Sequence, residues 1–443
     1  MSREIQLSDR FGYGRMLRFT LPSIAMMIFT SVYGVVDGFF VSNFVGKTPF
    51  AAVNLIMPYL MILGSPGFMI GTGGSALIAR LLGEGRHDRA NGVFSMLVYA
   101  AIAGGAVLAV AGAALMRPVA ALMGADGALI EDCVRYGRIC MLALPALVLQ
   151  YAFQSFLIAA QKPQLGLMIT VAAGVTNMVL DALLVAVLRL GVAGAAAATA
   201  ASQVVGGLLP LVYFARKNSS LLRLGRPEAD GRALLRTLTN GSSELMTNVS
   251  MSLVSMLYNV QLIRFAGENG VAAYGVLMYV NFVFQAAFIG YSTGIAPVIS
   301  YQYGAGRRDD LRGLLQRSLV IIAVLSAVMF VLPEAMAGQL AAVFVGYDAE
   351  LTALTGRAFM IYSVSFLFAG LSVFGSSFFT ALGDGLTSAL ISFLRTMVFQ
   401  VLAVLLLPMC FGIDGVWASI VAAEAASALM TAALLAVRRR AFC

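Results

Sequence analysis

Apolar segments long enough to cross a membrane recur along almost the whole chain of 443 residues. A membrane-spanning α-helix needs about 20 mostly apolar residues, and it satisfies its backbone hydrogen bonds internally. Only 11% of the residues are charged, whereas a soluble domain carries about 25%. We therefore predict an all-α polytopic membrane protein with twelve transmembrane helices. The predicted ranges are 17–40, 51–79, 92–116, 133–160, 165–188, 191–215, 237–263, 271–302, 314–332, 355–382, 386–408 and 412–437.

Lys and Arg residues are distributed unevenly between the two sets of loops that these helices define. With the N-terminus inside, the inner tails and loops carry roughly three times as many as the outer ends, in keeping with the positive-inside rule. The polar N-terminus, MSREIQLSDR, shows no cleavable signal peptide. We therefore predict a multi-pass protein of the cytoplasmic (inner) membrane with both termini in the cytoplasm. These loops account for the net charge of +8, so nucleic acid is not an expected partner.

The sequence also repeats itself at an offset of 221 residues. GTGGSALIARLLGEGRHD at 71–88 aligns without a gap with STGIAPVISYQYGAGRRD at 292–309, and Gly191 aligns with Gly412. Parallel repeats of this kind place a substrate site between the halves and suit alternating access, whereas a duplicated structural protein is the alternative. We predict two pseudo-symmetric six-helix bundles in the same orientation. The predicted division is an N-terminal bundle at 1–216, a cytoplasmic linker at 217–236 and a C-terminal bundle at 237–443.

Two aspartates, Asp37 and Asp181, lie inside predicted helices of the first bundle. A charged side chain near the bilayer centre costs about 2.5 kcal/mol or more, so its presence indicates a function. Asn177 lies one helical turn before Asp181, and Thr199 lies as far after the turn at Leu190 as Asp181 lies before it. Counting from the outer ends puts Asp37 at the same depth. The predicted cation- or proton-binding site therefore consists of Asp37, Asn177, Asp181 and Thr199.

Carboxylate, amide and hydroxyl oxygens are the ligands that hard cations such as Na⁺ prefer, whereas two neighbouring carboxylates can instead share one proton. The repeat provides an internal control, because no carboxylate occupies the equivalent positions of the second bundle. These positions are Tyr258, Val398, Leu402 and Ile420. A cluster that only stabilises the shared fold, which is the alternative, would be expected in both halves. No cofactor is predicted beyond a coupling ion, H⁺ or Na⁺, and no metal beyond a possible Na⁺ at this site.

Three further charged residues lie within predicted helices of the second bundle: Glu244, Arg395 and Glu424. Arg395 and Glu424 lie at matching depths on consecutive helices, so they form a buried ion pair or act in gating or charge recognition. Glu244 lies a few turns into the seventh helix and is a candidate second acceptor for a proton or cation. All three are secondary candidates for coupling or gating.

The chain resembles the multidrug and toxic compound extrusion (MATE) family of transporters over essentially its whole length. The resemblance is most specific in VDGFFVSNFVGKTPFAAVNL at 36–55, NMVLDALLV at 177–185 and FLRTMVFQVLAVLLLPMCFGIDGVWAS at 393–419. It implies two six-helix bundles and cation-driven efflux of hydrophobic, often cationic, drugs. The family's coupling motif in the N-terminal bundle falls on the four residues of the predicted site, and its typical arginine falls on Arg395. Glu244, in SSEL, departs from the proline-containing helix start of many members, which leaves open whether the second bundle takes part in coupling.

We predict a cation-coupled secondary antiporter that exports small organic compounds, expected to be cationic and hydrophobic, by alternating access. The chain is expected to work as a monomer in contact with membrane lipid. A flippase for a lipid-linked saccharide is an alternative, although Arg395 is the only basic residue deep in a predicted helix. A non-transporting sensor or scaffold is another. An enzyme is not predicted, because the sequence shows no nucleophile–base pair, metal-ligand cluster or phosphate-binding loop.

Overall fold

The computed structural model describes residues 5–45, 47–346 and 348–442, and these residues form helices and connecting loops without a strand. The first half contains α1 (Tyr13–Phe44), α2 (Lys47–Gly64), α3 (Pro66–Gly83), α4 (His87–Leu122), α5 (Gly127–Leu142), α6 (Leu144–Ala159), α7 (Pro163–Leu180), the π-helix η1 (Asp181–Val187) and α8 (Gly191–Ala215). The second half contains α9 (Gly231–Asn240), α10 (Ser242–Gly304), α11 (Arg308–Val345), α12 (Ala349–Ser363), α13 (Phe366–Leu382), α14 (Gly385–Phe393), the π-helix η2 (Leu394–Phe399) and α15 (Gln400–Phe442).

Every predicted transmembrane range overlaps a long apolar helix. Within the described residues, nine helical stretches are long and apolar enough to span a bilayer, and two bent pairs raise the number to eleven. The bent pairs are α5 with α6, at 59°, and α12 with α13, at 49°. The last stretch, Gly385–Arg438, contains 54 residues, which is about 80 Å of helix and far more than one crossing of a hydrocarbon core about 30 Å thick. It must therefore contain two spans.

The break in that stretch is at Gly412, whose φ of 58° lies in the left-handed region that favours glycine. Arg395 and Glu424 form an ion pair at 2.9 Å although 29 residues separate them. A straight helix would hold them about 43 Å apart, so the chain folds back at Gly412. Gly191, its equivalent in the first repeat, also has a positive φ of 61°. The same turn therefore connects the last two helices of each half.

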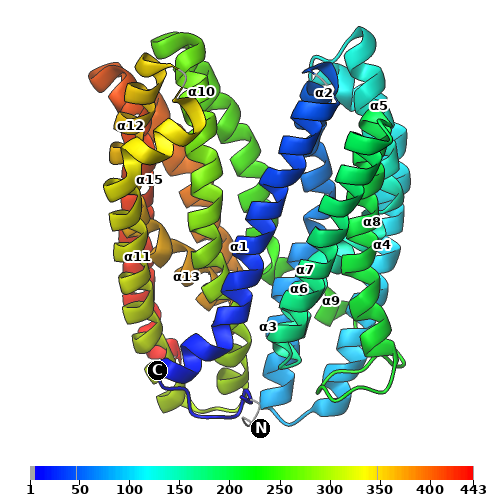
Figure 1. Cartoon of the computed structure of the whole chain (residues 1–443). Helices are drawn as coiled ribbons and strands as arrows, with labels where there is room; N and C mark the ends of the chain where they lie inside the picture. The colour runs from blue at the N-terminus through cyan, green and yellow to red at the C-terminus, as the bar shows by residue number, and fades with distance from the viewer. Residues whose placement is uncertain (1–4, 46, 347, 443) are drawn as a thin grey trace.

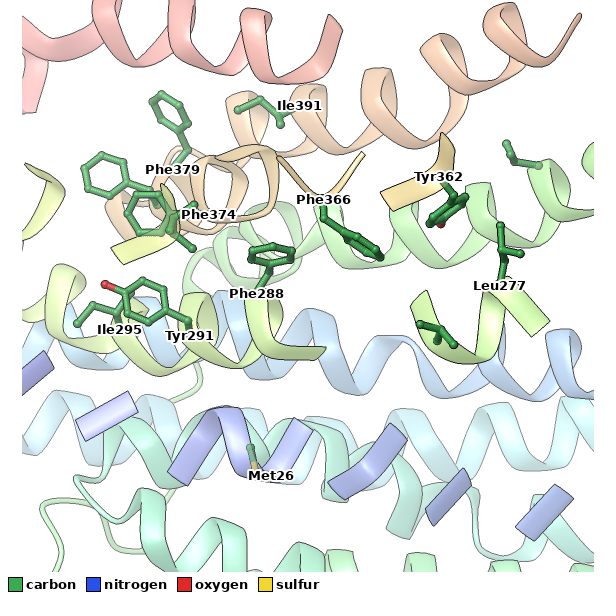
Figure 2. Packing of buried hydrophobic residues seen from close by; sticks show 14 of the residues in the cluster. Met26, Leu277, Phe288, Tyr291, Ile295, Tyr362, Phe366, Phe374, Phe379 and Ile391 are labelled. Carbon is green, nitrogen blue, oxygen red and sulfur yellow. The ribbon is translucent and has the colours of Figure 1, made fainter. Parts of the chain in front are cut away.

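The helices form two lobes, with α4, α5, α6 and α8 on one side and α11, α12, α13 and α15 on the other (Figure 1). Each lobe has its own hydrophobic core. Figure 2 shows the core of the second lobe, where Phe288 and Tyr291 of α10 face Phe366 and Phe374 of α13. The predicted fold class, an all-α membrane protein with two pseudo-symmetric lobes, is therefore confirmed.

The helix that opens the second lobe begins earlier than the hydropathy pattern predicts. The linker was expected to extend to residue 236, but α9 begins at Gly231. Asp230 caps its first turn by accepting hydrogen bonds from the backbone N–H groups of Arg232 and Ala233. The helix is amphipathic rather than uniformly apolar, so the apolar run that predicts the seventh span begins only after its first turn.

The lobes touch at the end of the molecule where the described chain begins and ends, which we call the base (Figure 1). A Cβ added to Gly83 would lie 2.2 Å from the carbonyl oxygen of Tyr301, and one added to Gly304 would lie 2.2 Å from that of Arg80. Gly83 and Gly304 are repeat equivalents, and so are Arg80 and Tyr301, since 221 residues separate the two members of each of these pairs. The contact therefore follows the pseudo-two-fold axis between the halves, and it depends on the absence of two side chains.

Replacing Gly83 and Gly304 together with alanine is expected to loosen the base, because each carbonyl must retreat by about 1 Å to reach an ordinary contact distance. Spin labels at His87 and Arg308, in a variant without native cysteines, should report a longer and broader distance distribution by pulsed paramagnetic resonance. Gly104→Ala is the control, because a Cβ there meets open space. An unchanged distribution in the double variant would show that this contact does not hold the lobes together.

Candidate cation-binding site

Two glycines bring α1, α7, η1 and α8 close together around the predicted site. A Cβ added to Gly174 of α7 would lie 2.6 Å from the ring of Phe29 on α1. A Cβ added to Gly194 of α8 would lie 3.0 Å from the carbonyl oxygen of Leu184 in η1. The π-helix itself begins at Asp181. Such segments are rare and frequently occur at functional sites, because they change the direction in which nearby side chains point.

The four predicted residues lie together in the structure. The carboxylate of Asp37 interacts with the side chains of Asp181 and Asn177. The hydroxyl of Thr199 lies near that of Tyr136 without meeting the geometry of a hydrogen bond, and Tyr136 also lies within electrostatic range of Asp37. Asp181 is fully buried at 0% exposure and Asn177 is 2% exposed, while Asp37 and Thr199 are half-buried. The role of this cluster in ion binding stays a prediction.

The cluster contains more hydrogen-bond acceptors than donors. Five of its oxygen atoms are buried and have no hydrogen-bond partner among the described residues: Asp37 Oδ1, Asn177 Oδ1, both carboxylate oxygens of Asp181, and Thr199 Oγ1. When both carboxylates are ionised, neither has a proton to donate to the other. Each buried group without a partner costs about 1–3 kcal/mol, which is a large penalty for a cluster that only stabilises the fold.

The charge of the cluster is also unbalanced. No Lys or Arg forms an ion pair with Asp37 or Asp181 in the part of the chain that the structure describes. The same described residues contain no group of three or more His, Cys, Asp or Glu side chains of the kind that binds a transition metal. An oxygen-only set with two carboxylates instead fits a hard cation such as Na⁺, or a proton shared between the acids.

Sequence reasoning missed the contribution of α5. Tyr136 is buried, and its hydroxyl lies near Thr199 and near Cys140, one helical turn further along. The predicted helix begins at residue 133, which places Tyr136 only three residues from its outer end, so the depth count did not match it to the site. The structure begins α5 at Gly127, nine residues before Tyr136, and this longer helix brings Tyr136 to the depth of Asp181. The two side chains close the cluster on the side of α5.

The second lobe contains a polar cluster of the opposite kind, in which the acid is neutralised. Nε of Arg395 lies 3.0 Å and 2.9 Å from the two carboxylate oxygens of Glu424, and both side chains are largely buried. Of the two roles left open by the sequence, the ion pair is therefore present. Tyr258, the repeat equivalent of Asp37, lies within electrostatic range of Glu424. The two lobes thus carry polar clusters at related positions, but only the first has uncompensated carboxylates.

The structure brings Glu244 into neither cluster. It lies three residues after Gly241, where an added Cβ would lie 2.1 Å from the carbonyl oxygen of Met69 on α3. Tyr258 is fourteen residues further along α10, about 21 Å away. Glu244 is half-buried at this junction between the lobes, and it forms no ion pair with a described residue.

Comparison with known proteins agrees with this architecture. A family model described as MatE matches residues 22–183 and, a second time, residues 245–406. The chain belongs to the MatE family. The two matches fall one in each half, as the internal repeat requires, and they cover well over half of the chain. The resemblance to MATE transporters is therefore confirmed, and the chain is a multi-pass membrane protein of a multidrug-efflux transporter family.

Relatives of known name share the full length of this MatE chain. The multidrug export protein MepA of Staphylococcus haemolyticus (strain JCSC1435) is 25% identical over 420 residues, which cover 94% of this chain and 91% of the relative. MepA of Staphylococcus aureus (strain MSSA476) is 24% identical over 429 residues, covering 95% and 92%. Among solved structures, a MATE protein in complex with MaL6 superposes with a TM-score of 0.93 at 23% identity, covering 100% of this chain and 99% of that chain. The outward-facing conformation of a multidrug resistance MATE family transporter gives the same TM-score at 22% identity and the same coverage.

Proposed function

We propose that this MATE transporter is a secondary antiporter of the bacterial inner membrane, which exports small organic compounds in exchange for H⁺ or Na⁺. The observation that carries the proposal is the group of five buried oxygen atoms without partners at Asp37, Asn177, Asp181 and Thr199. A cation or a proton would satisfy them. The MepA relatives are named multidrug export proteins, which supports the export of more than one small organic compound.

The first helix connects this site to the contact between the lobes. Its outer half packs on α7, where Phe29 meets Gly174. Its inner half packs on the second lobe, where a Cβ added to Gly290 of α10 would lie 2.5 Å from Cα of Ile24. Pro22 lies inside α1 and removes one backbone hydrogen bond there, so the helix can bend at low cost. Both lobes therefore contact α1, the helix that carries Asp37.

This connection suggests how an ion and a drug compete. A single H⁺ or Na⁺ entering from outside would cancel one of the two negative charges of Asp37 and Asp181, weaken their repulsion and favour close packing of α1 against α7 and η1. That change would alter the contact of α1 with α10 and bias the lobes toward one arrangement. A drug bound between the lobes would favour the other arrangement, because a ligand shifts an equilibrium only through its different affinity for the two states. The ion is exchanged for the drug when each of them stabilises a different arrangement of the lobes. All parts lie in one chain, so we propose a monomer.

The flippase alternative is less well supported. A site for the pyrophosphate of a lipid-linked saccharide needs cationic side chains that are free within the membrane. Arg395 is the candidate for that role, but Glu424 neutralises it. A sensor or scaffold of the same fold would have no need for partnerless carboxylates.

Transport of an ethidium-like dye in proteoliposomes tests the proposal. We expect uptake or release of the dye to follow an imposed pH gradient or an imposed sodium gradient, and the responding gradient identifies the coupling ion. Substrate-dependent ion flux should accompany it. Protein-free liposomes are the control. Dye movement that responds to neither gradient would contradict antiport, and it would leave the sensor or scaffold as the better explanation.

A further inference from the structure

A cavity of about 1330 Å³ lies near the base, between the two lobes. Its walls come from α3, the α3–α4 loop and α4 of the first lobe, and from α9 and the start of α14 of the second half. Gly73 and Leu81 line it from the first lobe, while Asp384 and Leu386 line it from the second. The base is the end that the positive-inside rule predicts to be cytoplasmic. The cavity is therefore separate from the predicted ion site, which lies in the outer half.

Positive side chains predominate in this cavity. Five arginines line it: Arg80, Arg86, Arg89, Arg232 and Arg236. Three carboxylates line it as well: Glu84, Asp230 and Asp384. Arg80 and Arg86 share one acid, Glu84, at 3.1 Å and 3.5 Å. Arg438, from α15, already pairs with Asp384. Glu84 and Asp384 are thus each paired with an arginine outside α9, and the lining of the cavity keeps a net positive charge.

Asp230 is not available to neutralise the arginines of α9. It caps the helix, and it pairs with Arg89 of α4 at 2.9 Å. Hydrogen bonds from the Ala233 backbone N–H and the Arg89 guanidinium hold the pKa of the Asp230 carboxyl below its ordinary value. Arg232 and Arg236 lie four residues apart on one face of α9, and both are exposed. Neither forms an ion pair or a side-chain hydrogen bond with a described residue.

The internal repeat shows that the fold does not require arginine here. In the first repeat, Phe11 occupies the position equivalent to Arg232, and it is buried in the hydrophobic core at 4% exposure. Leu7, equivalent to Glu228, is completely buried. The backbone of this segment is fixed by a hydrogen bond from Gln302 Nε2 to the Leu7 carbonyl, at 3.0 Å. One repeat therefore fills this position with apolar side chains, whereas the other lines an open cavity with arginine.

From this arrangement we propose that the cavity binds a phosphate ester, with the phosphate held between Arg232 and Arg236. A guanidinium group offers paired N–H donors that match phosphate oxygens, and two of them four residues apart can hold one phosphate from two sides. Leu386 lines the same cavity and is 81% exposed, and Leu235 is exposed beside the two arginines. This combination of charge and apolar surface fits the headgroup and first acyl carbons of an anionic phospholipid.

A ligand bound in this cavity would affect how the two lobes pack at the base. Anionic lipids are concentrated in the cytoplasmic leaflet, which the base is predicted to face. A ligand that contacts α3 or α4 of the first lobe together with α14 of the second would join the two lobes at the base. It would therefore stabilise the arrangement in which Gly83 and Gly304 are in contact. A soluble phosphate ester has the same recognition chemistry, so the experiment must distinguish the two sources.

Binding to the purified full-length protein in neutral detergent tests the proposal independently of transport. The probes are short-chain phosphatidylglycerol, phosphatidylcholine of the same chain length, and inorganic phosphate. We expect phosphatidylglycerol to bind, and Arg232→Ala/Arg236→Ala to weaken it at least about tenfold. Arg216→Ala/Arg226→Ala is the matched control, because it removes two exposed arginines of the linker region that do not line the cavity. The control should stay within about twofold of the parent protein.

Arg232→Phe provides a second variant, which keeps the test informative if Arg232→Ala/Arg236→Ala does not fold. It introduces the residue type of the other repeat and removes one of the two guanidinium groups, so it should weaken binding of phosphatidylglycerol at least about tenfold. If inorganic phosphate binds with the same dependence on arginine while phosphatidylglycerol does not, the phosphate site stands and its occupant is soluble. Equal affinities of the parent and both cavity variants for every probe would overturn the proposal. So would an equal loss in the linker control, because it would reveal attraction to general surface charge.

Discussion

Replacing Asp37 or Asp181 with asparagine is expected to abolish ion-driven drug export while leaving the protein folded in the membrane. Asparagine keeps the size and the carbonyl oxygen of the side chain, but it can neither ionise nor take up a proton. The dye-transport rate under the active gradient should fall at least about a hundredfold, which corresponds to about 2.7 kcal/mol of lost coupling. Export from cells and transport in proteoliposomes both measure it.

Two controls separate this result from simple loss of structure. Asp132→Asn, on α5 of the same lobe, changes a half-exposed carboxylate outside the cluster and should keep parental transport. The thermal stability of Asp37→Asn and Asp181→Asn should be equal to or higher than that of the parent, since each removes a buried, uncompensated charge. A loss of stability in both would instead favour a fold-stabilising cluster. Parental transport in both would show that the site assignment is wrong.

Replacing either member of the Arg395–Glu424 pair with alanine is expected to destabilise the protein by about 3–5 kcal/mol, because the remaining partner is left as a buried, unpaired charge. Replacing both together, as Arg395→Met/Glu424→Leu, should recover most of that loss, because two apolar side chains of similar volume need no partner. Unfolding followed in detergent gives the four free energies of a double-mutant cycle, from which the coupling between the two residues follows directly.

The Arg357–Asp414 pair supplies the comparison, since its arginine is largely exposed. Arg357→Ala should cost less than about 1 kcal/mol. If Arg395→Ala costs no more than that, the pair in the second lobe does not stabilise the fold. If Arg395→Met/Glu424→Leu is stable but no longer exports dye, the pair also acts in gating or charge recognition. The experiment therefore decides between the two roles that the sequence left open for these residues.

The spans and the repeat could be predicted from the sequence because their signal is local and regular. Each apolar run has nearly the length of a bilayer crossing, and the aligned glycines Gly191 and Gly412 mark equivalent turns in the two halves. Depth could also be predicted, since it depends only on counting residues from a turn. This counting placed Asp37 beside Asp181 before any packing was known, and the structure brings both carboxylates together.

Features that depend on how helices pack could not be predicted. Tyr136 lies near Thr199 because α5 packs on α8. Nothing in the apolar pattern around residue 143 specifies that packing or the bend of 59° between α5 and α6. The sequence also does not predict the π-helix at Asp181, because most of its residues are as apolar as those of the α-helix before it. The amphipathic start of the second lobe at Gly231 was missed because it is too polar to resemble a span.

The glycine contact at the base has a consequence for the origin of the fold. Each repeat offers the same surface to the other, which is the arrangement that a two-fold symmetric homodimer uses. A six-helix ancestor could therefore have closed this end by pairing with a second copy of itself. Fusion into one chain then freed the halves to diverge. Divergence gave one half the acidic Asp37 where the other has Tyr258, and gave one half Arg232 where the other has Phe11. A symmetric homodimer could not carry either difference in one copy alone, because its two copies share one sequence.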